Sequence, residues 1–156
     1  MIKIILSLLT FFTFANLNAK EIKVGIILGF TGPIESLTPD MASGAELAFK
    51  EASDSGALLN GSTISTLRAD STCIDSAAAT SAAEFLINQG ATAIMGADCS
   101  GVTGAILSNV AVPNGVPMIS PSATSPALTT AEDNGLFFRT APSDARGGEV
   151  LADITA

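Results

Sequence analysis

The chain has 156 residues, carries a formal net charge of −8 at pH 7 and contains no His, Trp or Tyr. An acidic surface repels phosphate groups, so the charge argues against a nucleic-acid partner. The absence of His excludes catalysis by Ser-His-Asp and Cys-His arrangements and removes the commonest zinc ligand. The composition therefore points away from DNA-binding proteins, His-dependent hydrolases and zinc enzymes.

The first 19 residues have the layout of a secretory signal peptide. Lys3 supplies a positive charge, residues 4–15 form an apolar run, and small and polar residues lead to Ala19. The run is too short to cross a hydrocarbon core about 30 Å thick as a helix. We therefore expect cleavage after Ala19 and export to the periplasm. A buried N-terminal helix and an uncleaved anchor are the alternatives.

Residues 20–156 alternate between strand and helix patterns, which predicts an α/β domain. Short β-branched or apolar runs predict strands over residues 20–28, 62–69, 91–95, 116–119 and 136–139. Helical spacing of apolar residues predicts helices over residues 41–53 and 75–88, from residue 99 to about 110, and from residue 143 to the last residue, 156. This order predicts a parallel sheet with helices on both faces.

The sequence also predicts how the first two helices are capped and packed. Asp40 is expected to cap the first helix, with Ala48 among its buried residues. The apolar stripe expected for the second helix consists of Ala78, Ala82, Phe85 and Leu86.

The chain contains two cysteines, Cys73 and Cys99. A secreted protein folds in an oxidising compartment, where a pair of cysteines is most simply explained as a disulfide. Closing a loop of this length contributes about 3–4 kcal/mol in the chain-entropy model. Two free, buried thiols are the alternative.

Three loops follow predicted strands at the edge where an open parallel sheet binds ligands. They are rich in hydroxyl groups and comprise residues 29–39, 96–101 and 120–125. Ser100 stands at a helix start, where N–H groups favour a carboxylate. Ser122 and Thr124 can add a carbonyl, a hydroxyl and an N–H, so the loops could hold both ends of an amino acid. Ordinary capping by Ser100 and turn formation by Ser122 and Thr124 are the alternatives.

Several short segments in a fixed order resemble one protein family. The most specific is the run Ile119-Ser-Pro-Ser-Ala-Thr124. The others are Ile22–Gly25, Thr31–Pro33, Gly44–Ala48, Asp70–Cys73, Gly96–Ser100 and Phe138–Thr140. With this pattern the chain resembles the leucine/isoleucine/valine-binding proteins of ABC transporters, which have the type I periplasmic binding fold.

The resemblance implies a role for each residue of the predicted site. Ser100 would bind the α-carboxylate of an amino acid, the carbonyl of Ser122 would accept from its ammonium, and Thr124 would add a donor. Ala123 lies in the same loop and belongs to the same set. Leu37 stands where several members have an aromatic residue near the ligand side chain, so the resemblance leaves the side-chain preference open.

The resemblance also has structural implications. The family's disulfide joins positions that match Cys73 and Cys99, and Arg139 matches an arginine that we interpret as structural. The family's second lobe, with the acid that usually pairs the ligand ammonium, would lie beyond Ala156. Residues 20–156 would then be the first lobe of a truncated fold and carry half of a site. This piece alone is expected to bind ligand weakly.

The implied function is that of an extracytoplasmic solute-binding component of an ABC transporter. Its ligand would be an amino acid, branched-chain by default, or a similar small polar molecule. The protein would act as a monomer, deliver the ligand to a membrane permease and need no cofactor or metal. The alternative is the ligand-sensing domain of a receptor, or of an amide or amino-acid regulator, with the same fold.

An enzyme is the less favoured interpretation. The segment Gly25–Gly29 lacks the G-x-G-x-x-G pattern of dinucleotide-binding proteins, and the chain has no P-loop. Asp70 and Asp98 stand alone in the sequence and are expected to be solvated or to cap helices. We therefore expect no enzymatic activity.

Overall fold

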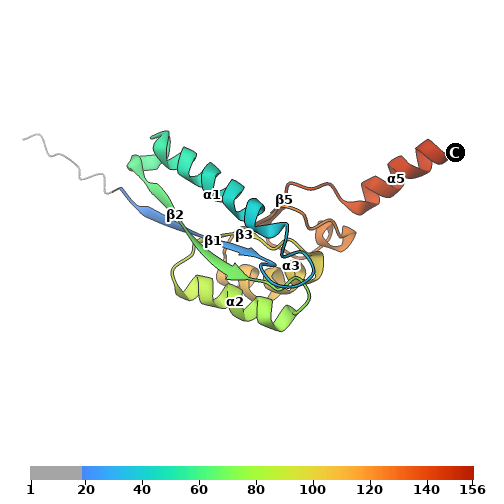
Figure 1. The fold of residues 1–156 in the computed structure, drawn as a ribbon, viewed down its shortest axis with the longest axis horizontal. Helices are drawn as coiled ribbons and strands as arrows, with labels where there is room; N and C mark the ends of the chain where they lie inside the picture. Colours follow the sequence, from blue (N-terminus) through green and yellow to red (C-terminus); the bar gives the residue numbers. More distant parts are fainter. Residues whose placement is uncertain (1–18) are drawn as a thin grey trace, which may run out of the picture.

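The computed structural model describes residues 19–156, which form a five-stranded parallel sheet with helices packed on it (Figure 1). The signal peptide predicted for residues 1–19 lies outside the described residues, apart from Ala19. The strands are β1 (Glu21–Leu28), β2 (Thr63–Asp70), β3 (Ala93–Gly96), β4 (Met118–Ser120) and β5 (Phe137–Arg139). Their order in the sheet is β2-β1-β3-β4-β5, and every neighbouring pair is parallel.

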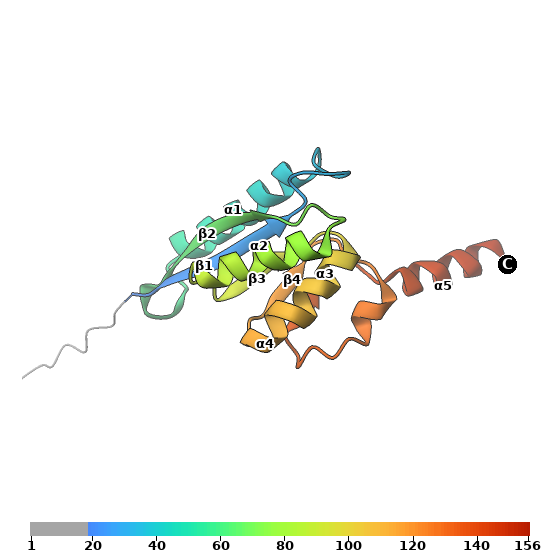
Figure 2. The same ribbon diagram turned by 90° about the horizontal axis from the view of Figure 1, so that it is seen from below.

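Helices cover both faces of this sheet, as the sequence predicted (Figures 1 and 2). The helical segments are α1 (Thr38–Asp54), η1 (Leu59–Gly61), α2 (Ser76–Asn88), α3 (Ser100–Ile106), η2 (Leu107–Ala111), α4 (Val112–Asn114), η3 (Pro126–Thr129) and α5 (Asp144–Thr155). Helix α1 lies on one face, and α2 and α3 lie on the other. The segments α3, η2 and α4 follow one another without a break, and η2 is a π-helical turn between two α-helical ones.

Strand β1 separates two hydrophobic cores. Ile26 and Leu28 point toward α1 and pack with Ala42, whereas Ile27 points to the opposite face and packs with α2 and α3. The side chains of Ile26, Ile27 and Leu28 are all fully buried. Because β1 lies between two strands and is covered on both faces, it has a continuous apolar sequence rather than an alternating one.

The packing of α2 confirms Leu86 of its predicted stripe, leaves Ala78 and Ala82 half-buried, and corrects Phe85. The buried positions are Ala79, Ala83 and Leu86, and Phe85 is 54 % exposed. Gly25 of β1 explains the difference, since a Cβ there would lie 2.7 Å from Leu86 Cδ1. The helix therefore approaches β1 closely through small residues, and this close approach turns Phe85 outward.

Helix α1 begins at Thr38, three residues before the predicted start. Leu37 is the residue before the first turn, and Asp40 lies inside that turn rather than capping it. Pro39 fits there because the first turn of a helix does not use its N–H groups. The Thr38 side chain is fully buried, and its hydroxyl donates to the carbonyl of Gly29 at 3.0 Å. Ala48, expected on the buried face, is exposed.

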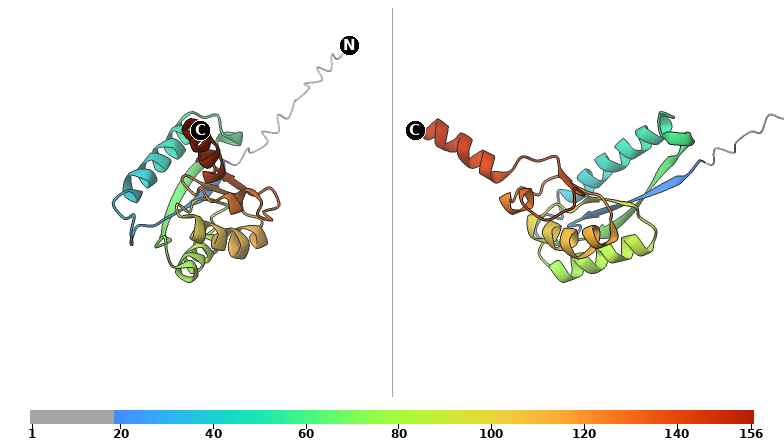
Figure 3. Two further views of the ribbon diagram at one scale, coloured as in Figure 1. Left: turned by 90° about the vertical axis from the view of Figure 1, so that its right-hand side faces the viewer. Right: turned by 180° about the vertical axis from the view of Figure 1, so that it is seen from behind.

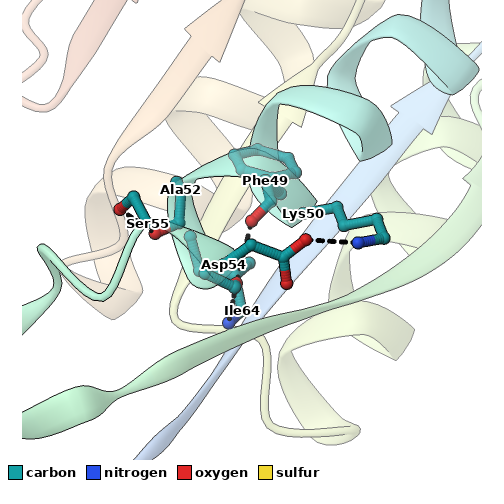
Figure 4. A network of polar contacts seen from close by, with 7 residues as sticks. Phe49, Lys50, Ala52, Asp54, Ser55 and Ile64 are labelled. Carbon is teal, nitrogen blue, oxygen red and sulfur yellow. Dashed lines mark hydrogen bonds and ion pairs between the residues drawn. The ribbon is translucent and has the colours of Figure 1, made fainter.

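The last turn of α1 is fastened to the start of β2 (Figure 4). The Ser53 hydroxyl accepts from the N–H of Ile64 at 2.9 Å and donates to the carbonyl of Phe49 at 2.8 Å. Lys50 and Asp54 form an exposed ion pair on the same turn. With this end fixed at β2, the other end of α1 lies at the carboxyl edge of the sheet.

Helix α5 extends away from the sheet, with its twelve residues exposed (Figures 1 and 3). Its exposed apolar side chains include Leu151 and Ile154, which are 62 % and 76 % accessible. Among the described residues, no helix combines the length and the apolar character needed to cross a membrane.

Candidate functional site

The carboxyl ends of β1, β3 and β4 bring the three predicted loops together. These strands are neighbours in the sheet, so the loops that begin at Gly29, Ala97 and Pro121 leave the same edge side by side. The chain leaves β1 toward the α1 face and β3 toward the α3 face. This divergence is a topological switch point, the position at which open α/β sheets bind ligands, and the space between these loops is called the crevice.

Ser100, the first residue of α3, is partly buried in this crevice. Its hydroxyl oxygen accepts from the N–H groups of Thr124 and Ser125, each at 3.1 Å. A serine hydroxyl has two lone pairs and one proton. Because both lone pairs are engaged by the loop after β4, the Ser100 hydroxyl can offer a ligand only its proton.

Thr124 has the opposite arrangement. Its hydroxyl donates to Oδ2 of Asp144 at 2.9 Å, and the N–H of Asp144 donates back to the carbonyl of Thr124 at 2.9 Å. The sequence predicted Thr124 as a donor to the ligand, but its single hydroxyl proton is bonded to Asp144. The Thr124 hydroxyl can therefore offer a ligand only its lone pairs.

Ser122 is exposed, and its hydroxyl donates to the carbonyl of Asp98 at 3.0 Å. Its own carbonyl makes no hydrogen bond within residues 19–156, so it remains free to accept. Ala123 is different. Its side chain is fully buried in the core, its N–H donates to the Ser120 hydroxyl at 3.0 Å, and its carbonyl accepts from Arg139 at 3.4 Å. Ala123 thus shapes the loop from within.

Leu37 lies 61 % exposed at the end of the loop after β1. A short chain of hydrogen bonds links it to the other predicted residues. The neighbouring Thr38 bonds the carbonyl of Gly29, whose N–H donates to Oδ2 of Asp98 at 2.7 Å. The carbonyl of Asp98 in turn accepts from Ser122. Direct hydrogen bonds therefore connect Ser100 with Thr124, whereas Leu37 is connected to the site only indirectly.

Asp98 is neither solvated nor a helix cap, which corrects the expectation from sequence. It is 4 % exposed, and its side chain accepts from Gly29, Ser71 and Cys99. Little in the sequence indicates this role, because an aspartate between a strand and a helix start is usually a cap. Its three donors come from three different loops, and their convergence appears only in the folded chain.

Cys73 and Cys99 form the predicted disulfide. It joins the loop after β2 to the residue immediately before Ser100, and no free cysteine remains among the described residues. The bond therefore ties the start of α3 to the loop after β2.

Asp70 connects the loop after β1 with the loop after β2. Its carboxylate accepts from the Thr31 hydroxyl at 2.5 Å, from the Thr31 N–H at 3.2 Å and from the Thr72 N–H at 2.8 Å. Burial acts to raise the pKa of Asp70, but these bonds and a further contribution from the Phe30 N–H outweigh it and hold the pKa below its ordinary value. Gly32 allows the close approach of these loops, since a Cβ there would lie 2.5 Å from the Thr72 carbonyl oxygen.

Arg139 supports the loop after β4 from behind. Its guanidinium donates to the carbonyls of Ser125 and Ala123 at 2.9 and 3.4 Å, and also to the Thr129 hydroxyl. Because these three bonds hold the loop, Arg139 has the structural role that the resemblance implied.

The profile of the family described as "Periplasmic binding protein" matches residues 21–156. The chain belongs to this family. The match covers the whole sheet and every loop of the crevice, and it confirms both the resemblance and the fold inferred from the sequence.

Curated relatives in the family are similar over most of this chain. The Leu/Ile/Val-binding protein homolog 3 of Brucella melitensis biotype 1 is 30 % identical over 142 residues, which are 90 % of this chain and 37 % of the relative. The Leu/Ile/Val-binding protein of Escherichia coli K12 is 30 % identical over 140 residues, or 89 % of this chain and 37 % of the relative. The chain thus spans little more than a third of their length.

Solved structures of family members have the same fold. The substrate-binding protein LivJ of Streptococcus pneumoniae, solved with isoleucine, superposes with a TM-score of 0.70 at 32 % identity over 80 % of this chain and 35 % of that one. A substrate-binding protein of Desulfitobacterium hafniense in complex with Leu superposes with a TM-score of 0.72 at 30 % identity, over 87 % of this chain and 38 % of that one. A solute-binding protein of R. palustris in complex with benzoate superposes with a TM-score of 0.69 at 29 % identity, over 81 % of this chain and 34 % of that one.

Proposed function

We propose that this chain forms the first lobe of an extracytoplasmic solute-binding protein that delivers an amino acid to an ABC transporter. The observation that carries the proposal is the opposite hydrogen-bonding capacity of two neighbouring hydroxyls. Ser100 can offer only a proton, and Thr124 can offer only lone pairs. This pair fits a ligand that carries a carboxylate and an ammonium on the same carbon atom.

The other groups at the crevice support a zwitterionic ligand. The free carbonyl of Ser122 provides a second acceptor for the ammonium, and the exposed carboxylate of Asp144 places a negative charge beside Thr124. The proton of Ser100 supplies a donor for the carboxylate. A leucine, isoleucine or valine would match each of these groups with its α-carbon substituents and leave an aliphatic side chain free to reach Leu37.

A ligand with a carboxylate alone would use only part of this site. One relative was solved with benzoate, which has no ammonium. Such a ligand would satisfy Ser100 but leave Thr124 and Ser122 covered and without a donor. A buried polar group that loses its partner costs about 1–3 kcal/mol, so this half-site favours amino acids over simple carboxylic acids.

The proposed mechanism requires no covalent step. The amino acid binds first to the loops of this lobe, and a second lobe then closes over it and shifts the population toward a closed form. The closed form is what the permease of the transporter recognises. Export through residues 1–19 would place the protein in the periplasm, where it would act as a monomer.

A thermal-shift comparison of matched ligands tests the proposal. The natural reading frame that contains this sequence is mixed with leucine, with 4-methylpentanoate, which lacks the ammonium, or with isoamylamine, which lacks the carboxylate. A ligand at 100 times its dissociation constant stabilises the folded state by about 2.7 kcal/mol. We expect a clear rise in melting temperature with leucine or another aliphatic amino acid, and little change with the two analogues. An equal rise with 4-methylpentanoate, or a rise with benzoate alone, would contradict the amino-acid assignment.

A further inference from the structure

The carboxylate of Asp98 is the meeting point of the crevice loops. Oδ2 accepts from the Gly29 N–H at 2.7 Å, and Oδ1 accepts from the Cys99 N–H at 2.9 Å and from the Ser71 hydroxyl at 3.3 Å. Asp98 is 4 % exposed, and none of the ion pairs of the described residues includes it. Its charge is therefore stabilised by two backbone N–H groups and one hydroxyl rather than by a cation.

Two of these carboxylate bonds, and one more to the Asp98 backbone, lead to residues of the proposed site. Gly29 is linked through Thr38 to the position of Leu37, and Cys99 is followed directly by Ser100. The backbone carbonyl of Asp98 accepts from Ser122. A single residue thus holds the loops after β1, β2, β3 and β4, and the packing leaves little freedom, because a Cβ on Gly29 would lie 3.4 Å from Oδ2 and 3.2 Å from the Cβ of Cys73.

We propose that Asp98 is a positioning residue for ligand binding, whose buried carboxylate sets the distance between the β1 loop and the Ser100–Ser122 side of the crevice. This inference rests on the proposed function and adds a determinant of affinity that touches no ligand atom. Its chemistry is specific to a carboxylate, which has acceptor oxygens on both sides. An amide of the same shape must turn its NH2 group toward either Gly29 or the Cys99–Ser71 pair, where a donor would face a donor.

The substitution Asp98→Asn therefore separates one loop from the others while leaving the side-chain volume unchanged. A purely structural role would lower the melting temperature and leave the affinity of the folded protein unaltered. A positioning role lowers the affinity itself. Both quantities are measured in the natural reading frame that contains this sequence, with leucine or the aliphatic amino acid that gives the larger thermal shift, by calorimetry at a temperature where every variant is folded.

Asp70→Asn is the matched control. Asp70 also accepts bonds from the β1 and β2 loops, but it has no bond to the loops after β3 and β4. We expect Asp98→Asn to weaken ligand binding about tenfold or more, the equivalent of one lost hydrogen bond to a charged group. We expect Asp70→Asn to weaken it less than about threefold. Amide exchange at Gly29 and Thr124 should become faster in Asp98→Asn alone.

Three results would decide against the inference or keep it testable. An affinity of Asp98→Asn within about twofold of the parent protein, despite a lower melting temperature, would overturn the positioning role. If Asp98→Asn does not fold, Ser71→Ala removes one of the three donors, and it should weaken binding by several-fold; unchanged binding would count against the inference. If the parent protein binds no amino acid, the proposed function fails. Faster amide exchange at Thr124 in Asp98→Asn would then still support the positioning role, and unchanged exchange would overturn it.

Discussion

Thr124 and Asp144 exchange two hydrogen bonds, one from the threonine hydroxyl to the carboxylate and one from the aspartate N–H to the threonine carbonyl. Asp144 is the first residue of α5, so this pair joins the ligand loop after β4 to the helix that leaves the lobe. The same pair determines the chemistry of the site, because it commits the only hydroxyl proton of Thr124.

Asp144→Asn should weaken amino-acid binding selectively. The substitution removes the negative charge beside Thr124, so we expect the affinity for leucine to fall about three- to tenfold, in the range of one charge-assisted interaction. Binding of 4-methylpentanoate, which has no ammonium, should stay the same or improve. Isothermal calorimetry with both ligands measures the difference, and Asp153→Asn, elsewhere on the exposed surface of α5, is the control. Equal losses for both ligands would mean that Asp144 acts on the loop and not on the ammonium.

Ser100→Ala should weaken every carboxylate ligand. The substitution removes the proton that the site offers to a carboxylate and leaves the N–H groups of Thr124 and Ser125 without their acceptor. We expect a loss of affinity of about tenfold or more and a loss of about 1–3 kcal/mol in the free energy of unfolding. Ser108→Ala, which removes an exposed hydroxyl bonded to the Gly104 carbonyl, should change neither the affinity nor the free energy of unfolding. Unaltered leucine binding by Ser100→Ala would remove Ser100 from the site.

Two glycines near the site should respond to alanine in opposite ways. Gly96 ends β3 with φ at +131°, and a Cβ there would lie 2.0 Å from the Ile27 carbonyl oxygen. Gly96→Ala should therefore lower the free energy of unfolding by at least about 2 kcal/mol. Gly101 lies in α3, and apart from its chain neighbours and the backbone of its own helix no atom lies within 4 Å of its Cβ position. Gly101→Ala should therefore raise the free energy of unfolding by about 0.5–1 kcal/mol. Urea denaturation of both variants measures these changes. An unchanged free energy of unfolding in Gly96→Ala would show that the sheet edge can move.

The contribution of Asp70 to stability should depend on pH. Its pKa is lower in the folded protein than its ordinary value of about 3.9, so the folded state favours the charged form. Stability from this group is fully present above that ordinary value and is lost as the pH falls through the lowered folded pKa. We expect Asp70→Asn to be less stable than the parent at pH 7 and to approach it at pH 3. Denaturant titrations at both pH values test this expectation. A stability difference between the two proteins that grows toward pH 3 would contradict it.

The sequence predicted those features that depend on local pattern. The five strands, the faces covered by helices and the disulfide follow from periodicity and composition. The buried face of α2 could not be read in the same way, because it depends on the missing side chain of Gly25 in another strand. The start of α1 was placed too late because Asp40 resembles a cap, whereas the hydroxyl that anchors this helix belongs to Thr38.

The same limit applies to the site. Ser100, Ser122 and Thr124 could be proposed from their places after strands, but the direction of each hydroxyl bond depends on a partner in another loop. The role of Asp98 is hidden in the sequence for this reason, since Gly29, which donates to it, is 69 residues away. Polar networks of this kind are recognisable only when the fold brings their members together.

The wide spacing of these partners also bears on how the protein folds. The contact between Gly29 and Asp98 spans 69 residues and that between Ser100 and Thr124 spans 24. Closing such long loops is entropically costly, and contacts of this range form slowly compared with helical turns. We therefore expect the crevice to form late in folding, after β1, β3 and β4 have aligned. The site needs residues from Gly29 to Ser125, so no short peptide cut from the sequence will reproduce it.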